Sequence, residues 1–219
     1  PPAAMTLNLL DQNNVPVDLY HVVEPNASSQ EGAILNNVEP SAVLAMLDES
    51  GFDYDVLART SALIPVAGKV FGNVNIGGQP TETWTTDSRK LRVTFDAPVG
   101  TVSIKAYHGG ATAASFGRIE AYNAQNQLLD RITSGPITGS TADTLTLTRA
   151  AGDIAYVIVR AHAQSSIVLD SLEWGTPGEA QIDSQGAYSF AYLPAGTYRV
   201  KPEPQPGHTV TAPAAGCAS

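Results

Sequence analysis

The chain has 219 residues, with 12 Lys and Arg against 21 Asp and Glu, and its formal net charge at pH 7 is −9. This acidic balance disfavours nucleic acid and anionic membrane surfaces as partners, because phosphate binding needs a basic surface. No apolar run approaches the roughly 20 residues of a membrane-spanning helix, so membrane insertion is not expected. The single Cys217 allows neither an intramolecular disulfide nor a Cys-based metal site.

The N-terminal segment predicts a β-hairpin. Residues 5–23 read MTLNLLDQNNVPVDLYHVV, in which apolar residues alternate on both sides of a DQNN turn. The polar connection that follows contains Asn26-Ala27-Ser28, a glycosylation sequon so short that chance accounts for it. Because the chain begins at Pro1 without a signal segment, we expect a mature or excised form.

Residues 41–50, SAVLAMLDES, are predicted to form the one short helix of the chain. Ser41 can cap its N-terminus, and Val43, Leu44 and Leu47 fall on one helical face. Residues 52–78 mix short apolar runs with Gly and Pro, which indicates irregular strands and loops, and residues 79–90 read as a polar loop.

Seven strands are predicted between Leu91 and Trp174, because apolar and polar residues alternate there and Gly, Pro, Asn or Asp closes each segment. The segments are 91–96, 101–107, 117–123, 127–133, 143–149, 154–161 and 166–174. They are enough for an all-β fold of two packed antiparallel sheets. The predicted inward set is Val93, Phe95, Val102, Ile104, Ile119, Leu128, Leu145, Ile154, Tyr156, Ile158, Leu172 and Trp174.

Beyond a turn-rich junction after Trp174, residues 180–211 predict two or three more strands. So few strands cannot bury a core alone, and they need a partner elsewhere.

Four stretches resemble the galactose-binding-like jelly-roll domains of many bacterial extracellular proteins. They are LRVTFDAPVGTVSI at 91–104, IEAYNAQNQLL at 119–129, IAYVIV at 154–159 and LDSLEW at 169–174. The resemblance implies an antiparallel jelly-roll β-sandwich over residues 30–175. It also implies a structural Ca²⁺ at one edge of the sandwich, for which Asp170 and Glu173 are the matching acids.

Residues 183–200, DSQGAYSFAYLPAGTYRV, resemble the closing strands of collagen-adhesin B-type and carboxypeptidase-regulatory-like small β-sandwiches. The N-terminal MTLNLLDQNNVPVDL resembles the earlier hairpin of those domains. The two resemblances together imply that residues 1–29 and 176–219 form one small Ig-like β-sandwich into which the jelly roll is inserted. The family's Lys–Asn cross-link is not expected, because the matching strands lack Lys.

An intermolecular alternative stays open, in which a neighbouring subunit completes this small sandwich by strand donation. The family's usual first strand would lie upstream of Pro1, and its absence leaves an edge that a neighbour or a longer chain would fill.

Sugar binding needs exposed aromatic rings beside polar groups. Trp84 and Arg89, close together in the polar loop, and Tyr107 and Tyr122, near strand ends, are the candidate ligand-binding residues.

No motif of a nucleophile, phosphate loop or metalloprotease is present, so we expect no enzyme. We expect an extracellular or bacterial cell-surface protein with a structural or adhesive role. Such a protein would be a filament or surface component that associates with itself or with other surface proteins through strand edges. The alternative is a carbohydrate-binding module of a larger secreted protein, which would be a monomer with an exposed aromatic cluster that contacts glycans.

Overall fold

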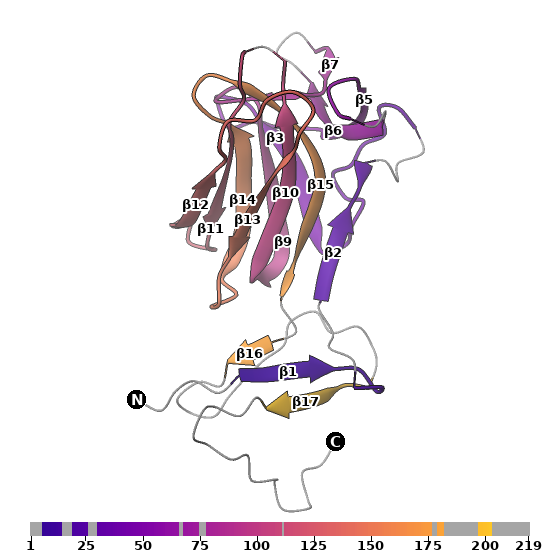
Figure 1. Ribbon diagram of the computed structural model, residues 1–219, viewed down its shortest axis with the longest axis vertical. Helices are drawn as coiled ribbons and strands as arrows, with labels where there is room; N and C mark the ends of the chain where they lie inside the picture. Colours follow the sequence, from indigo (N-terminus) through magenta and orange to yellow (C-terminus); the bar gives the residue numbers. More distant parts are fainter. Residues whose placement is uncertain are drawn as a thin grey trace, which may run out of the picture. The chain divides into compact units, whose positions relative to one another are not determined.

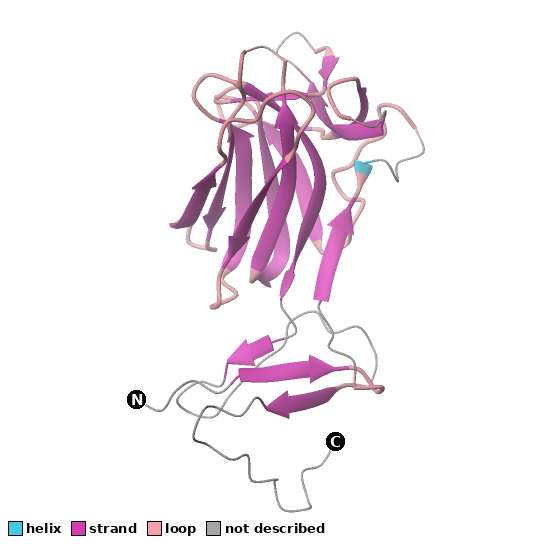
Figure 2. Ribbon diagram, viewed as in Figure 1, coloured by secondary structure: helices cyan, strands magenta, loops and turns pink. Residues whose placement is uncertain are grey.

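The computed structural model describes residues 6–14, 19–25, 30–65, 68–74, 78–110, 112–176, 179–181 and 197–202. Its elements are strands, and no α-helix occurs in these ranges; the short cyan piece in Figure 2 is a 3₁₀ turn at Pro25 (Figures 1 and 2). The chain divides into two compact units, one formed by residues 1–20 with 176–219 and the other by residues 21–175. In sequence, the larger unit is therefore inserted between two segments of the smaller one.

The smaller unit contains a three-stranded antiparallel sheet with the N-terminal strand at its centre. β1 (Thr6–Leu10) pairs on one side with β16 (Glu179–Gln181) and on the other with β17 (Arg199–Pro202). Leu7 and Leu9 of β1 are buried. The two ends of the chain thus pair within one molecule. The small Ig-like sandwich stays a prediction, because most of the segment that suggested it, like the sequon at 26–28, lies outside the described residues.

The N-terminal hairpin is not formed by the first two strands. β2 (Leu19–Val23) pairs with β15 (Ser166–Thr176) of the larger unit, whereas β1 pairs with β16 and β17. Residues 15–18, which the expected second strand included, are not described. Residues 21–25 belong to the larger unit, whereas the sequence assigns residues 1–29 to the small sandwich.

The larger unit is built from two antiparallel sheets. The six-stranded sheet has the order β12-β11-β14-β9-β3-β4. Its strands are β3 (Ala42–Leu47), β4 (Asp53–Tyr54), β9 (Lys90–Val99), β11 (Gly117–Tyr122), β12 (Leu128–Thr133) and β14 (Ile154–Ala161).

The eight-stranded sheet follows the order β13-β10-β15-β6-β5, with β2 and β8 added on β15 and β7 on β6. Its remaining strands are β5 (Leu57–Ser61), β6 (Gly68–Val74), β7 (Pro80–Thr81), β8 (Thr83–Thr85), β10 (Thr101–His108) and β13 (Asp143–Thr148).

The core lies between the two sheets. Gly117 of β11 is so close to the opposite sheet that an added Cβ would lie 3.0 Å from Leu145 Cδ1 and 3.2 Å from Ala106 Cβ. Trp174 is buried on β15, with its ring 5.9 Å from that of Phe95 in the six-stranded sheet. Apolar side chains from both sheets thus interdigitate, as the predicted all-β sandwich requires.

The seven strands predicted between Leu91 and Trp174 are confirmed as β9 to β15. The predicted short helix at 41–50 is wrong, because Ala42–Leu47 is strand β3, paired with β9 and β4. Its alternate residues Ala42, Leu44 and Met46 are buried while Val43 is exposed, which is the period of a strand.

Candidate functional site

The six-stranded sheet turns alternate side chains away from the core, and the strand register arranges them in three rows across β12, β11, β14, β9 and β3. The aromatic row is Leu128, Tyr122, Tyr156, Thr94 and Val43. The mixed row is Arg131, Glu120, Ile158, Arg92 and Ala45. The basic row is Thr133, Arg118 and Arg160.

The aromatic row holds two stacked rings. Tyr122 and Tyr156 face each other across β11 and β14, with ring centroids 4.8 Å apart and planes inclined by 5°. The guanidinium carbon of Arg92 lies 4.8 Å from the centroid of the Tyr156 ring, in the geometry of a cation–π contact. The Tyr156 hydroxyl donates to Asn126 Oδ1 at 3.2 Å. These rings are partly exposed and held in place from several sides.

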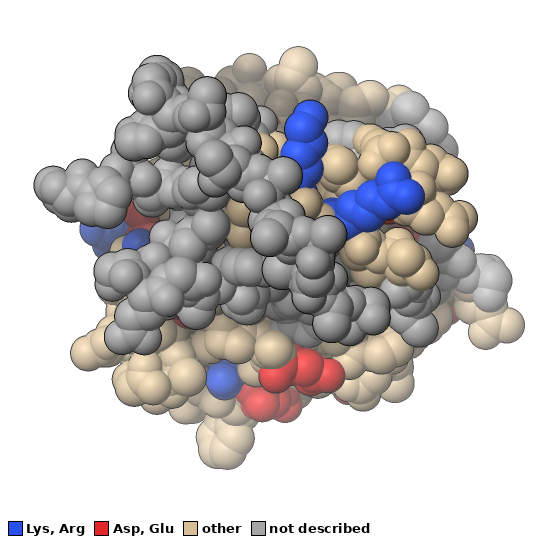
Figure 3. All heavy atoms as spheres, turned by 90° about the horizontal axis from the view of Figure 1, so that it is seen from below, with Lys and Arg blue, Asp and Glu red and all other residues tan. Residues whose placement is uncertain are grey.

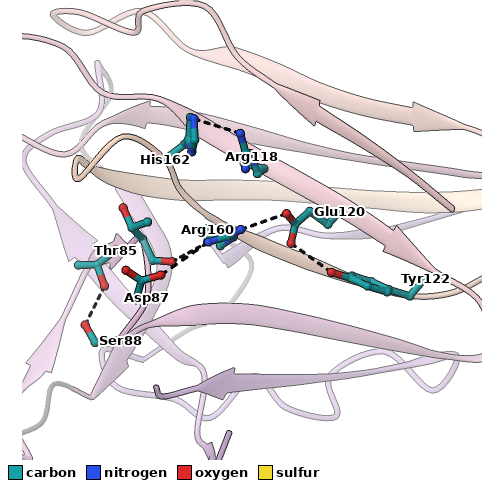
Figure 4. Close-up of polar contacts among 9 residues, drawn as sticks. Thr85, Asp87, Ser88, Arg118, Glu120, Tyr122, Arg160 and His162 are labelled. Carbon is teal, nitrogen blue, oxygen red and sulfur yellow. Dashed lines mark hydrogen bonds and ion pairs between the residues drawn. The ribbon is translucent and has the colours of Figure 1, made fainter. Parts of the chain in front are cut away.

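Glu120 and Arg160 form the polar centre of the face (Figure 4). Arg160 Nη2 donates to Glu120 Oε1 at 3.1 Å, and the other Glu120 oxygen accepts from the Tyr122 hydroxyl at 3.3 Å. Arg160 Nη1 also donates to the Thr86 carbonyl at 3.2 Å and lies 3.7 Å from Asp87 Oδ1. Burial, followed by the charge of Glu120, raises the pKa of Tyr122, which keeps its hydroxyl protonated as a donor.

Arg118 stands opposite Arg160 and has different partners. Its Nε donates to Thr133 Oγ1 at 2.9 Å, and its Nη2 lies 3.0 Å from His162 Nε2. Burial and then the charges of Arg118, Arg160 and Arg131 lower the pKa of His162. His162 is therefore neutral at pH 7, and its Nε2 accepts from Arg118.

Trp84, predicted to contact sugar, lies in the core. Its side chain has 0% exposure, and Nε1 donates to the Phe71 carbonyl at 2.7 Å. It sits on β8, paired with β15 through Ile167. The ring therefore offers no face to a ligand.

The other predicted ligand residues do not come together. Tyr122 lies on the six-stranded sheet, while Tyr107 lies on β10 of the eight-stranded sheet, opposite Val168. Burial, then the charges of Asp170 and Glu24, raises the pKa of Tyr107. Arg89 precedes β9 and is half-buried, and burial lowers its pKa. Of the four residues, Tyr122 alone belongs to the three rows.

Asp170, predicted as a calcium ligand, is a buried carboxylate on β15. Its residue is 7% exposed and its Oδ1 has no hydrogen-bond partner, while burial, with the charge of Glu24, raises its pKa. Glu173 is partly exposed and pairs with Ser103. Within the described ranges, no three His, Cys, Asp or Glu side chains gather closely enough to hold a metal ion. Calcium binding stays a prediction.

A serine and a histidine meet near the end of β10, in a structural contact. His108 Nδ1 lies 2.7 Å from Ser115 Oγ, which also accepts from the Gly109 N–H at 3.0 Å. Ser115 has 0% exposure, so no substrate can reach its hydroxyl in this conformation. The contact fixes the turn between β10 and β11.

Sequence reasoning missed most of this face. The alternation assigns Tyr156 and Ile158 to the core and does not single out Arg92, Arg118, Glu120 and Arg160, whereas the structure leaves Tyr156 and Ile158 partly exposed. The signal that could have found them is the polar half of each alternating strand, which places Arg118, Glu120 and Tyr122 on one side of β11.

In the view of Figure 3 the described charged side chains lie in small separate groups, without a continuous basic surface among them. The described part of the chain contains no helix that is long and apolar enough to cross a membrane.

No protein-family model and no curated protein matches this chain. Solved structures similar to the chain include the K2 cleaved adhesin domain of Lys-gingipain, with 12% identity, a TM-score of 0.43, and 71% of this chain and 98% of that one covered. Lys-gingipain is a protein of Porphyromonas gingivalis. A second is the Clostridium thermocellum xylanase 10B CBM22-1–GH10 structure, with 10% identity and a TM-score of 0.42. The match covers 73% of this chain and 29% of that one.

A third is the family 11 carbohydrate-binding module of a cellulosomal cellulase from Clostridium thermocellum, with 10% identity and a TM-score of 0.31. The match covers 68% of this chain and 96% of that one. With TM-scores below 0.5, these likenesses carry no conclusion about this chain, and its function is argued from its own side chains.

Proposed function

We propose that this chain is a non-enzymatic β-sandwich, extracellular or at a bacterial cell surface, that makes adhesive contacts by binding carbohydrate through the three rows. The observation that carries the proposal is the Tyr122–Tyr156 stack beside the Glu120–Arg160 pair. A sugar presents apolar C–H groups together with many hydroxyls. The partly exposed Tyr122 ring matches the first, and a carboxylate with a guanidinium supplies acceptors and donors for the second.

The rows also suit binding because their groups are already ordered. Glu120 is held between Arg160 and the Tyr122 hydroxyl, and its side chain is 8% exposed. Tyr156 lies between Tyr122 and Arg92. Side chains fixed on strands lose little further conformational freedom when a ligand arrives, so more of the contact energy remains as affinity.

The proposal is tested with a panel of soluble polysaccharides in affinity electrophoresis, followed by calorimetry on those that retard the chain. Tyr122→Ala removes one ring and the donor to Glu120, and we expect at least a tenfold weaker binding, which corresponds to about 1.4 kcal/mol. Phe52→Ala is the matched control, because Phe52 is 67% exposed and lies outside the rows.

Thermal unfolding of each variant shows whether it is folded. If no polysaccharide binds, or if Tyr122→Ala and Phe52→Ala weaken binding equally, the proposal fails.

A structural role through strand edges is a second candidate, and β12 supports it. This strand lies at the edge of the six-stranded sheet, and its Leu128 and Ile132 are 48% and 37% exposed. An exposed edge can pair with a strand of another molecule. This role predicts that the mass measured by light scattering rises with concentration and that Ile132→Lys prevents the rise. A mass constant at one chain over that range would exclude it.

A further inference from the structure

The basic row contains an unfavourable pairing. Arg118 of β11 and Arg160 of β14 are directly opposite each other in the strand register. Like charges directly opposite each other on neighbouring strands repel, so this pair makes the sheet less stable. The neighbouring mixed row adds Arg131, opposite Glu120, and Arg92. Four arginines are thus concentrated on one face of a chain whose net charge is −9.

The carboxylates nearby are committed to one of these arginines. Arg160 contacts both Glu120 and Asp87. Arg118, in contrast, contacts the Thr133 hydroxyl and the His162 ring, and among the described residues no carboxylate forms an ion pair with it. Figure 4 shows Arg118 with His162 on one side of the Arg160–Glu120 pair. The Arg118 charge is therefore positioned by neutral partners and remains uncompensated.

The lowered pKa of His162 reflects the positive charge around it. Its imidazole accepts a hydrogen bond from Arg118, and after burial the charges of Arg118, Arg160 and Arg131 are the causes that lower its pKa. A neutral imidazole orients the Arg118 side chain without cancelling its charge. An anion arriving at Arg118 would gain from this uncompensated charge and from the exposed Arg131, whereas the Arg160 charge is already balanced by Glu120 and Asp87.

We propose that Arg118 and Arg131 form a subsite for the carboxylate of an acidic polysaccharide. This inference rests on the carbohydrate binding proposed above and names its ligand class. Arginine is suited to the task because its planar donors match the two oxygens of a carboxylate. Tyr122 lies four residues from Arg118 on β11, which is about 14 Å along the strand. A ligand that contacts both is therefore longer than one sugar ring.

The experiment compares three polymers by calorimetry at the same ionic strength: polygalacturonate, its fully methyl-esterified form and dextran sulfate. Esterification removes the charge and keeps the sugar backbone, so it isolates the carboxylate. We expect polygalacturonate to bind at least tenfold more tightly than its ester. Arg118→Gln should remove that preference.

Lys105→Gln is the matched control, because it removes one positive charge from the eight-stranded sheet, where Lys105 is exposed. It should leave the preference intact. Arg131→Gln, whose side chain is exposed on the edge strand β12, repeats the test if Arg118→Gln does not fold.

Equal affinity for the acid and the ester overturns the carboxylate subsite and leaves the proposed function standing, provided that the binding still depends on Tyr122. Dextran sulfate bound as tightly as polygalacturonate also overturns it, since the face would then attract any polyanion. Equal losses in Arg118→Gln and Lys105→Gln overturn it as well. If none of these polymers or the polysaccharides of the panel binds, both proposals fail.

Discussion

Trp84 donates its indole N–H to the carbonyl of Phe71 at 2.7 Å, and both residues have 0% exposure. The bond joins β8 to β6 inside the larger unit. Trp84→Phe keeps an aromatic ring but removes the indole N–H. The change leaves a void in the core and deprives the Phe71 carbonyl of this hydrogen bond. We expect the free energy of unfolding to fall by about 1–3 kcal/mol, measured by urea denaturation.

Carbohydrate binding should survive this change, because Trp84 lies outside the three rows. Measured on the folded variant, a loss of binding with unchanged stability would show that Trp84 contacts the ligand, as the sequence alone suggested.

The buried carboxylate of Asp170 makes stability depend on pH. Burial raises its folded pKa above the usual 3.8. The protonated form is thus favoured in the folded state, and its stabilising contribution is complete below 3.8 and lost as pH rises through the folded pKa. Asp170→Asn removes this loss. In chelator, we expect the difference in unfolding free energy between the variant and the wild type to grow in favour of the variant as pH rises from about 4 to 7.

Urea denaturation across that range measures the difference. Curves that stay parallel for the two proteins would mean that ionisation of Asp170 costs the fold nothing.

We expect the Asp170 carboxylate to bind Ca²⁺, which would stabilise the folded protein. The Asp170 oxygen without a hydrogen-bond partner is a hard ligand that suits Ca²⁺. A cation bound only to the folded state raises the melting temperature as its concentration rises. We expect such a rise in the wild type, its loss in Asp170→Asn and a smaller rise in Glu173→Gln. Asp87→Asn is the control, since Asp87 lies in an exposed loop. A rise that all variants share would place the ion elsewhere.

The strands between Leu91 and Trp174 could be predicted because each has one face in the core and one in solvent, which imposes a two-residue period. Residues 41–50 could not, since Val43, Leu44 and Leu47 fit a helical face as well as Ala42, Leu44 and Met46 fit a strand. Pairing of β3 with β9 decided between them. No local signal in the segment reports that distant partner.

The face assignments failed where the register shifts. Pairing of β14 with β9 is irregular between Ile154 and Tyr156, so Ile154 stays in the core while Tyr156 and Ile158 turn outward. A similar shift after Ala121 accompanies the exposed Leu128. One extra residue exchanges the two faces of a strand.

For the same reason, the sequence could not predict that Arg118 meets Arg160 or that Tyr122 meets Tyr156. These pairs depend on the register between two strands whose paired residues are 42 and 34 positions apart in the sequence, and turns and bulges set that register jointly.

Gly109, which directly follows β10, lies too close to the backbone of Ser166 on β15 for any side chain. A Cβ added there would lie 2.4 Å from the carbonyl carbon and oxygen of Ser166. The Gly109 N–H also donates to the Ser166 carbonyl at 3.1 Å and to Ser115 Oγ at 3.0 Å, so the backbone cannot move without losing these bonds. We therefore expect Gly109→Ala to lower the free energy of unfolding by about 1–3 kcal/mol, as overpacked sites do.

Gly135→Ala is the matched control for this change. An added Cβ at Gly135 meets nothing within 4 Å and the backbone there is not in the left-handed region, so alanine fits without strain. Because alanine also restricts the unfolded chain, we expect Gly135→Ala to be neutral or stabilising by up to about 1 kcal/mol. Urea denaturation of both variants separates the close approach at Gly109 from a general effect of replacing glycine. Equal stabilities would mean that β10 and β15 can separate at this point without cost.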